Sequence, residues 1–174
     1  MADDEAEFRQ FVAVRMPAMR RSANLLCGDP HQADDLVAIA IGKLFRSWRR
    51  VRRTEHPEAY VRRVLVNGWL DEQCRPWRRE RSTDRLPEPP GQSDPDLTER
   101  LTLLHLLDRL PARRRAVLVL RFLDDLSVED TAEVLGISTG TVKSQTARGL
   151  SDLRAVIGAS DPHLEGTPSR RELR

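Results

Sequence analysis

A proline-rich stretch near the middle of the chain limits what this sequence can fold into. Residues 84–95 read DRLPEPPGQSDP and hold four of the eleven prolines. Proline fixes φ and lacks a backbone N–H, so neither a helix nor a central strand continues through such a run. We therefore expect a first domain over residues 5–82, a linker over 83–97, a second domain over 98–157 and a tail over 158–174.

Both pieces have the apolar spacing of helices. Large apolar residues recur at intervals of three and four, and no segment alternates as a strand would. The expected fold class is all-α, with two small, weakly associated helical domains joined by the proline-rich linker. Four helices are expected in the first piece, the first ending near Pro17 and the last running from Glu58 to about Arg79. The second piece is expected to form helices over residues 101–110, 112–123, 127–135 and 138–157.

Positive charge is concentrated in one segment. Residues 42–82 hold twelve Lys and Arg against five Asp and Glu, whereas the whole chain has a net charge of only +2. A basic segment on a nearly neutral protein favours a polyanion as the partner, and a solvated helical face is the alternative interpretation.

Several functional classes lack their sequence signals. The longest uncharged apolar run, residues 36–42, is far shorter than the roughly 20 residues of a membrane helix, and the first residues, MADDE, are acidic where a signal peptide is basic. Cys27 and Cys74 form no CxxC pair, which indicates reduced thiols. The histidines have no metal-site spacing, and no nucleotide-binding loop or serine-nucleophile turn is present. We expect a cytoplasmic protein with no membrane partner, metal, cofactor or enzymatic activity.

Residues 126–154 have the order of a helix-turn-helix. Ser127 to Asp130 forms a capping box, Gly136 suits a sharp turn, and Val142 is apolar where the second helix packs back on the first. The second helix then presents polar side chains that can read base edges and phosphates in a major groove. A hairpin with a solvated polar side is the alternative. The expected duplex-binding residues are Ser138, Thr139, Thr141, Lys143, Ser144, Gln145 and Arg148, with Arg114, Arg115 and Arg121 as phosphate clamps.

Residues 56–81 combine arginines with aromatic side chains. Unpaired bases stack on aromatic rings while arginines follow the backbone, so this composition favours single-stranded DNA. The expected contacts are Tyr60, Arg63, Asn67, Trp69 and Asp71. For Trp69, packing in the core is an equally good interpretation.

Residues 34–48 are more apolar than a lone surface helix needs. They predict either a docking face for a helical partner or a central core helix. Trp48 and Trp77 favour core or partner contacts over DNA.

Over residues 5–157 these motifs together resemble the bacterial extracytoplasmic-function sigma factors of the small actinobacterial type. DDLVAIAIGKLFRSW is similar to the helix that docks on the clamp helices of the polymerase β′ subunit. HPEAYVRRVLVNGWLDEQCR is similar to the helix that opens the −10 element and captures a flipped base. LPARRRAVLVLRFLDDLSVEDTAEVLGISTGTVKSQTARGLSDLR is similar to the domain that reads the −35 element.

The resemblance implies an alternative sigma factor. Such a protein binds core RNA polymerase, through the β′ clamp helices and the β flap, and directs initiation at promoter DNA by recognising both elements and aiding melting. An anti-sigma protein is a further implied partner. The implied polymerase contacts are Asp35, Leu36, Ile39, Phe45 and Trp48, and the connector arginines Arg49, Arg50, Arg52 and Arg53 would join Asn67 on the opened strand.

The chain departs from the family pattern in two places. Ala38 and Ile39 stand where the family usually has Gln and an acidic residue, which bears on polymerase affinity, and Gln145 stands where a basic residue is commoner, which bears on promoter specificity. Two other functions stay open: a free-standing helix-turn-helix transcriptional regulator, and a sigma-like interaction module held by an inhibitor.

Overall fold

The computed structural model describes residues 2–74 and 95–160, and within them every regular element is helical. The elements are α1 (Ala2–Cys27), α2 (Pro30–Val51), α3 (Pro57–Gln73), α5 (Pro95–Asp108), α6 (Ala112–Leu118), the π-helical turn η1 (Val119–Leu123), α7 (Val128–Leu135) and α8 (Thr139–Ser160). The all-α class is confirmed. None of these described helices is both long and apolar enough to cross a membrane.

The predicted helix end near Pro17 is wrong, because α1 continues through this residue. It is one helix of 26 residues with Pro17 inside it, so the first piece contains three described helices where four are expected. Pro17 lies on the exposed side, while Phe8 and Val12 before it and Ala23 and Leu26 after it are all buried. Because this apolar row continues across the proline, packing outweighs the loss of one backbone hydrogen bond.

The next two helices begin where local chemistry predicts. The Asp29 side chain accepts a hydrogen bond from the backbone N–H of Gln32 at 2.9 Å, and Pro30 occupies the first turn of α2. Pro57 begins α3 in the same way. The rest of the helix expected to reach Arg79, the side chain of Trp77 and most of the linker lie outside the described residues.

The helix-turn-helix is present as α7 and α8. Ser127 Oγ accepts from the Asp130 N–H at 2.9 Å and caps α7, and Ser138 Oγ accepts from the Thr141 N–H at 3.1 Å and caps α8. Gly136 between them has φ 64°, a left-handed conformation that glycine adopts without a steric penalty.

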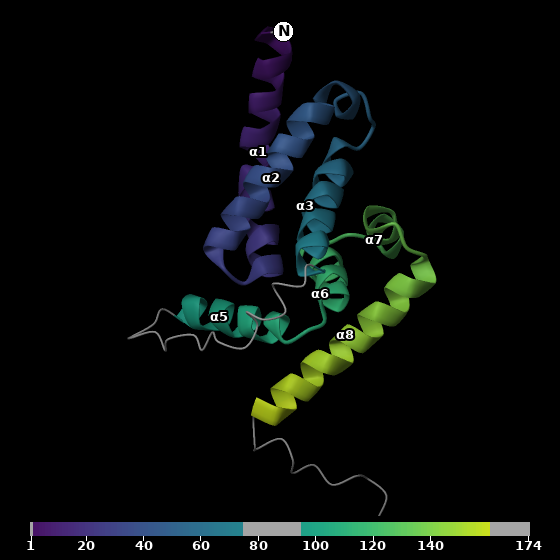
Figure 1. Cartoon of the computed structure of the whole chain (residues 1–174). Helices are drawn as coiled ribbons and strands as arrows, with labels where there is room; N and C mark the ends of the chain where they lie inside the picture. The colour runs from purple at the N-terminus through teal and green to yellow at the C-terminus, as the bar shows by residue number, and fades with distance from the viewer. Residues whose placement is uncertain (1, 75–94, 161–174) are drawn as a thin grey trace, which may run out of the picture.

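The two helix sets pack against each other more closely than expected. Helices α1, α2 and α3 lie side by side, α6 and α7 contact α3, and α8 runs along α6 (Figure 1). One cluster of buried side chains includes Leu65 and Trp69 of α3 together with Leu118 and Leu120 from the second set. The core is therefore continuous across the two sets.

Polar groups join the two sets at the edge of this core. Arg115 of α6 is 3% exposed, and its Nε donates to the Leu25 carbonyl at 2.8 Å. Ser22 Oγ donates to Asp124 Oδ1 at 2.7 Å. Burial raises the pKa of the Asp124 carboxyl, against the lowering effects of the Ser22 hydrogen bond and of the nearby Arg62 and Arg21.

The substitution Asp124→Asn tests this buried acid. The folded protein binds the Asp124 proton more tightly than the unfolded chain, where the ordinary pKa is 3.8. The stability of the wild type therefore falls, through this group, as the pH rises from about 4 through the raised pKa of the folded state. Asparagine does not titrate. We expect the free energy of unfolding of Asp124→Asn, minus that of the wild type, to rise with pH over this interval and then level off.

Urea unfolding at about pH 4 to 7 measures the difference. A difference that falls with pH would mean that the Ser22 hydrogen bond and the attraction of Arg62 and Arg21 outweigh burial at Asp124, and would contradict the direction stated above.

Candidate nucleic-acid interface

The first three turns of α8 present the polar face that the sequence predicts. Thr141 and Gln145 are half-buried, and Val142 beneath them is fully buried in a small cluster with Val117 and Ala132. This cluster fixes the rotation of α8, so its polar residues face outward. The exposed members are Ser138, Thr139, Lys143, Ser144 and Arg148.

The start of α8 favours an anion. Its first turn contains no acidic residue. The Ser138 hydroxyl is occupied by capping and lies 2.8 Å from the Thr141 hydroxyl. The positive end of the helix dipole and Lys143 together produce a local field that suits a phosphate.

Two of the predicted phosphate clamps have partners within the protein. Arg114 forms an ion pair with Asp152 of α8, which ties α6 to α8. Arg121 donates to the Leu126 carbonyl and so closes the loop before α7. Both side chains are half-buried.

The prediction that Arg115 is a phosphate clamp is not supported by its position in the structure. It is buried, donates to Leu25 and to Asp108 Oδ1 at 3.0 Å, and its guanidinium lies 5.8 Å from the centroid of the Trp69 ring. Burial lowers its pKa, and the hydrogen bond to Asp108 opposes that shift. In this structure Arg115 holds helices together and does not reach solvent to meet a phosphate.

The polar row of α3 remains accessible. Arg63 and Asp71 are exposed, and Asn67 between them is half-buried. Trp69 is 2% exposed in the shared core, which supports the packing interpretation over base stacking. Tyr60 is half-buried, so part of its ring stays open to solvent.

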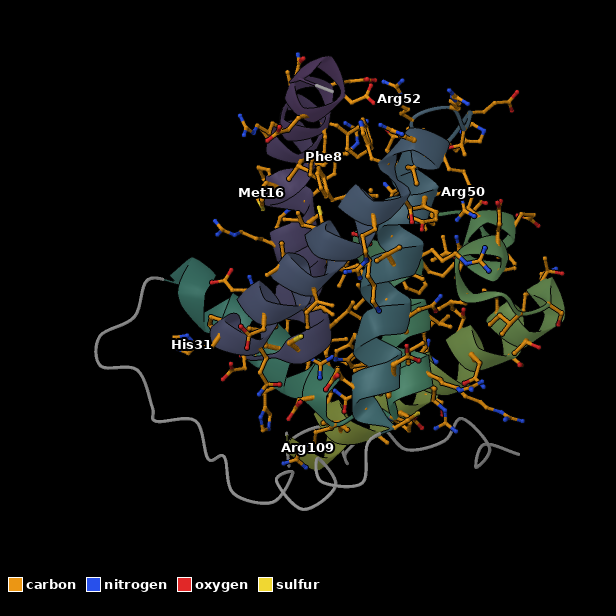
Figure 2. The ribbon with its side chains drawn as sticks, turned by 45° about the horizontal axis from the view of Figure 1, so that its top comes forward. Phe8, Met16, His31, Arg50, Arg52 and Arg109 are labelled. Carbon is orange, nitrogen blue, oxygen red and sulfur yellow. The ribbon has the colours of Figure 1, made fainter. Side chains whose placement is uncertain are left out.

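The basic connector consists of the last turn of α2, with Arg49 and Arg50, and the residues just after it, with Arg52 and Arg53. Contacts that the sequence reasoning missed arrange these arginines. The Arg50 guanidinium lies 5.9 Å from the centroid of the Tyr60 ring. Arg49 and Arg52 form ion pairs with acids of the first two turns of α1, and Figure 2 shows Arg52 beside that end of the helix. Among the described residues, no carboxylate pairs with Arg53. The acidic residues at the start of α1 were the available sequence signal for these ion pairs.

Helix α2 divides its predicted docking residues between core and surface. Leu36 and Trp48 are buried, and the Trp48 ring lies 4.9 Å from that of Phe11. These two side chains pack the inner face of α2 into the core. Ile39 and Phe45 are about half exposed, at 50% and 55%. Asp35 is also exposed.

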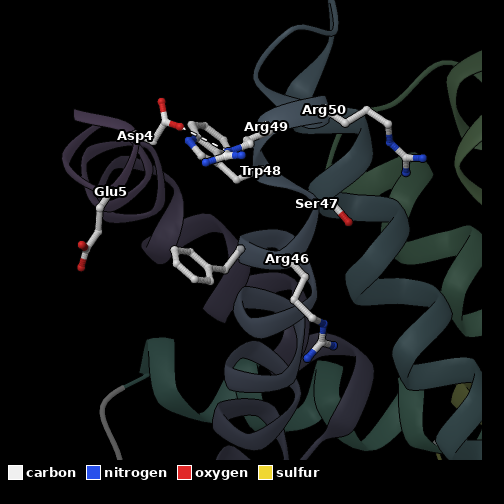
Figure 3. Close-up of a pocket in the computed structure, with 8 residues that line it drawn as sticks. Asp4, Glu5, Arg46, Ser47, Trp48, Arg49 and Arg50 are labelled. Atoms are coloured by element: carbon white, nitrogen blue, oxygen red, sulfur yellow. Dashed lines mark ion pairs between the residues drawn. The ribbon is translucent and has the colours of Figure 1, made fainter. Parts of the chain in front are cut away.

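An open hollow of about 750 Å³ lies beside Phe45 and the C-terminal end of α2, with the acidic start of α1 on its other side (Figure 3). No group of three or more His, Cys, Asp or Glu within residues 2–74 and 95–160 is arranged to hold a metal ion. The side chains that line the hollow are mainly charged and aromatic, among them Asp4, Phe45 and Arg49.

Two family models match the chain. The model described as Sigma-70 region 2 matches residues 11–82, and the model described as Sigma-70, region 4 matches residues 100–153. The first match covers α2 and α3 with most of α1, and the second covers the helix-turn-helix.

Curated relatives match nearly the whole length. The RNA polymerase sigma-E factor of Streptomyces coelicolor is 35% identical over 174 residues, which cover 97% of this chain and 94% of the relative. The ECF RNA polymerase sigma factor SigM of Mycobacterium tuberculosis is 27% identical over 162 residues, which cover 91% of this chain and 81% of the relative.

Solved structures share the arrangement of helices. The sigma factor RpoE of Bartonella quintana, in complex with the anti-sigma factor NepR, has a TM-score of 0.69 at 22% identity and covers 89% of this chain and 99% of its own. CnrH, in complex with the cytosolic domain of CnrY, has a TM-score of 0.66 at 21% identity, with coverage of 90% and 91%. At these identities the likeness establishes the fold.

Proposed function

The chain belongs to the extracytoplasmic-function RNA polymerase sigma factors, and we propose that it acts as a dissociable initiation subunit that binds core polymerase in the cytoplasm. In this proposal the polymerase performs catalysis. The chain supplies promoter choice and helps to melt the DNA. The observation that carries the proposal is the exposed, acid-free polar face at the start of α8, on the same molecule as the basic connector.

We assign the −35 element to α8. Its N-terminal turns are seated by buried Val142, and the exposed side chains of Lys143, Ser144 and Arg148 can reach base edges and phosphates in a major groove. Gln145 can pair with adenine, whereas an arginine or lysine at that position would favour guanine. Arg115 is left out of this surface because it is buried.

We assign the opened −10 element to α3 and the connector. Arg63, Asn67 and Asp71 form one row along α3, so an amide that can pair with a base is flanked by charged groups. Tyr60 and Arg50 add a partly open ring and a cation at the start of the helix. Arg53 is exposed and can follow the backbone of the displaced strand.

The polymerase surface that we propose is the exposed side of α2. Ile39 and Phe45 offer apolar contact, and Asp35 adds a charge. The β′ clamp helices are the partner that family membership supports for this surface. An anti-sigma protein would compete with polymerase for this side of α2. The exposed apolar surface beside an open hollow supports such a second partner.

Reconstituted transcription tests the proposal. Purified chain is added to core polymerase from a related bacterium with genomic DNA fragments, and the RNA products are sequenced. We expect transcripts that share upstream elements and that are absent with core polymerase alone. Folded protein that neither binds core polymerase nor changes the transcripts would refute the assignment, and tight operator binding without polymerase would favour a free-standing regulator.

Removing Arg148 should weaken −35 recognition. In holoenzyme formed with Arg148→Ala, we expect duplex affinity to fall by about 1–3 kcal/mol, roughly 5- to 150-fold, if the guanidinium contacts a base. Arg154→Ala is the matched control, since Arg154 is an exposed arginine farther along α8. Fluorescence anisotropy over a salt series measures both. Equal effects of the two variants would remove Arg148 from the site.

Removing the amide of Asn67 should impair promoter opening and leave polymerase binding intact. We expect Asn67→Ala to reduce permanganate reactivity of thymines in the −10 region, because the opened strand loses a base contact. The control is Gln10→Ala, which removes an exposed amide from α1. Normal melting by Asn67→Ala would mean that Asn67 does not capture a base.

A further inference from the structure

Two acids at the start of α1 hold two arginines of the basic connector. Arg52 Nη1 lies 2.7 Å from Asp4 Oδ1 and 2.7 Å from Glu7 Oε2, so a single guanidinium nitrogen has two carboxylate partners. Arg49 Nε lies 3.5 Å from Asp4 Oδ2 (Figure 3). Arg52 donates a hydrogen bond to Glu7, and this bond, aided by the charges of Asp4 and Glu7, raises the pKa of Arg52.

The helix dipole does not account for this pattern by itself. Acids near a helix N-terminus are favourable wherever they point, and Glu5 is such an acid. Its carboxylate pairs with Arg9 of its own helix at 2.6 Å, and Figure 3 shows it pointing away from Arg49. Asp4 and Glu7 are one turn apart and both reach the connector across the space between α1 and α2.

The packing beneath these ion pairs keeps them in register. Phe8, next in the chain after Glu7, is buried with its ring 5.0 Å from that of Phe45 and 5.4 Å from that of Trp48. These contacts hold the first turns of α1 against the C-terminal end of α2. The acids are therefore held opposite the arginines by the aromatic core and do not depend on the ion pairs for their position.

We propose that Asp4 and Glu7 stand in for DNA phosphates, occupying Arg49 and Arg52 until nucleic acid displaces them. This inference rests on the proposed function, in which the connector contacts the opened strand. The acids thereby lower the affinity of the connector for any nucleic-acid backbone. Because backbone contacts carry no sequence information, the base-reading side chains gain relative weight in choosing a site.

The acids should lower the DNA affinity only moderately, because exposed ion pairs are individually weak. Arg49 is 75% exposed, so its ion pair is open to solvent, and Arg52 at 28% keeps part of its side chain exposed. A strand that presents several phosphates can displace the acids. We expect their removal to raise affinity about two- to five-fold per acid, within the range of surface pairs.

Salt dependence provides a second signature. An arginine that binds DNA without an internal partner takes part in counterion release, whereas one that exchanges a carboxylate for a phosphate releases fewer ions. For single strands the slope of log K against log salt changes by about −0.7 for each phosphate neutralised. Freeing Arg52 should therefore steepen the slope by up to about 0.7.

The experiment measures binding of the full-length chain to a fluorescein-labelled single strand of about 20 nucleotides, by anisotropy between about 50 and 200 mM NaCl. The variants are Glu7→Gln and Asp4→Asn. The matched control is Glu5→Gln, which makes the same charge change between those two positions but touches no connector arginine. Glu7→Gln and Asp4→Asn should bind more tightly with a steeper slope, and Glu5→Gln should resemble the wild type.

Three outcomes would overturn the inference. An equal gain in affinity from Glu5→Gln would mean that net charge alone causes the effect. No gain in affinity from Glu7→Gln and Asp4→Asn would mean that these acids do not compete with DNA. Weaker binding by these two variants would mean that the acids orient Arg52 for DNA. Circular dichroism melts confirm that each variant is folded.

An Arg53→Ala arm separates this inference from the proposed function. If Arg53→Ala weakens binding to the single strand, the connector contacts DNA, and this conclusion holds for any result with Glu7→Gln. If it does not, the assignment of the connector to the strand is itself wrong.

Discussion

The burial of one guanidinium group, that of Arg115, constrains how the two helix sets can meet. A buried cation is costly unless its donors are satisfied. Leu25 at the end of α1 accepts from Nε, Asp108 at the end of α5 accepts from Nη1, and the Trp69 ring of α3 lies near the charge. Nη2 is buried without a hydrogen-bond partner among the described residues, so the guanidinium is satisfied only in part. Gly28 leaves room, since a Cβ there would come within 3.2 Å of Arg115 Nη2. These contacts tie α6 to the ends of α1 and α5 and to α3.

The parts of the fold that sequence predicts are those with a local cause. Ser127, Gly136 and Ser138 determine caps and a turn through groups within four residues of themselves, so the helix-turn-helix follows from its own stretch of chain. Pro17 was misleading because its cost is local while the compensating apolar row is packed against another helix. Local rules do not include the packing energy of that row against the other helix.

Site prediction has the same limit. The polar face of α8 could be identified because its residues share one helix and one buried row beneath them. Arg115 was misassigned as a surface cation, although it lies three and four residues before buried Leu118 and Val119, a spacing that already favours the inner face. The pairing of Arg52 with Asp4 and Glu7 depends on how α1 crosses α2, and no motif in either segment encodes that crossing.

The continuous core has a consequence for how such a chain can diversify. Leu65 and Trp69 from one set and Leu118 and Leu120 from the other lie in the same buried cluster. A recombination event that joined either half to a foreign partner would leave apolar surface uncovered and would deprive Arg115 of the Leu25 carbonyl. In the proposed function the two halves read two promoter elements, so a change of promoter specificity that keeps this core intact is confined to substitutions on the outer faces of α3 and α8.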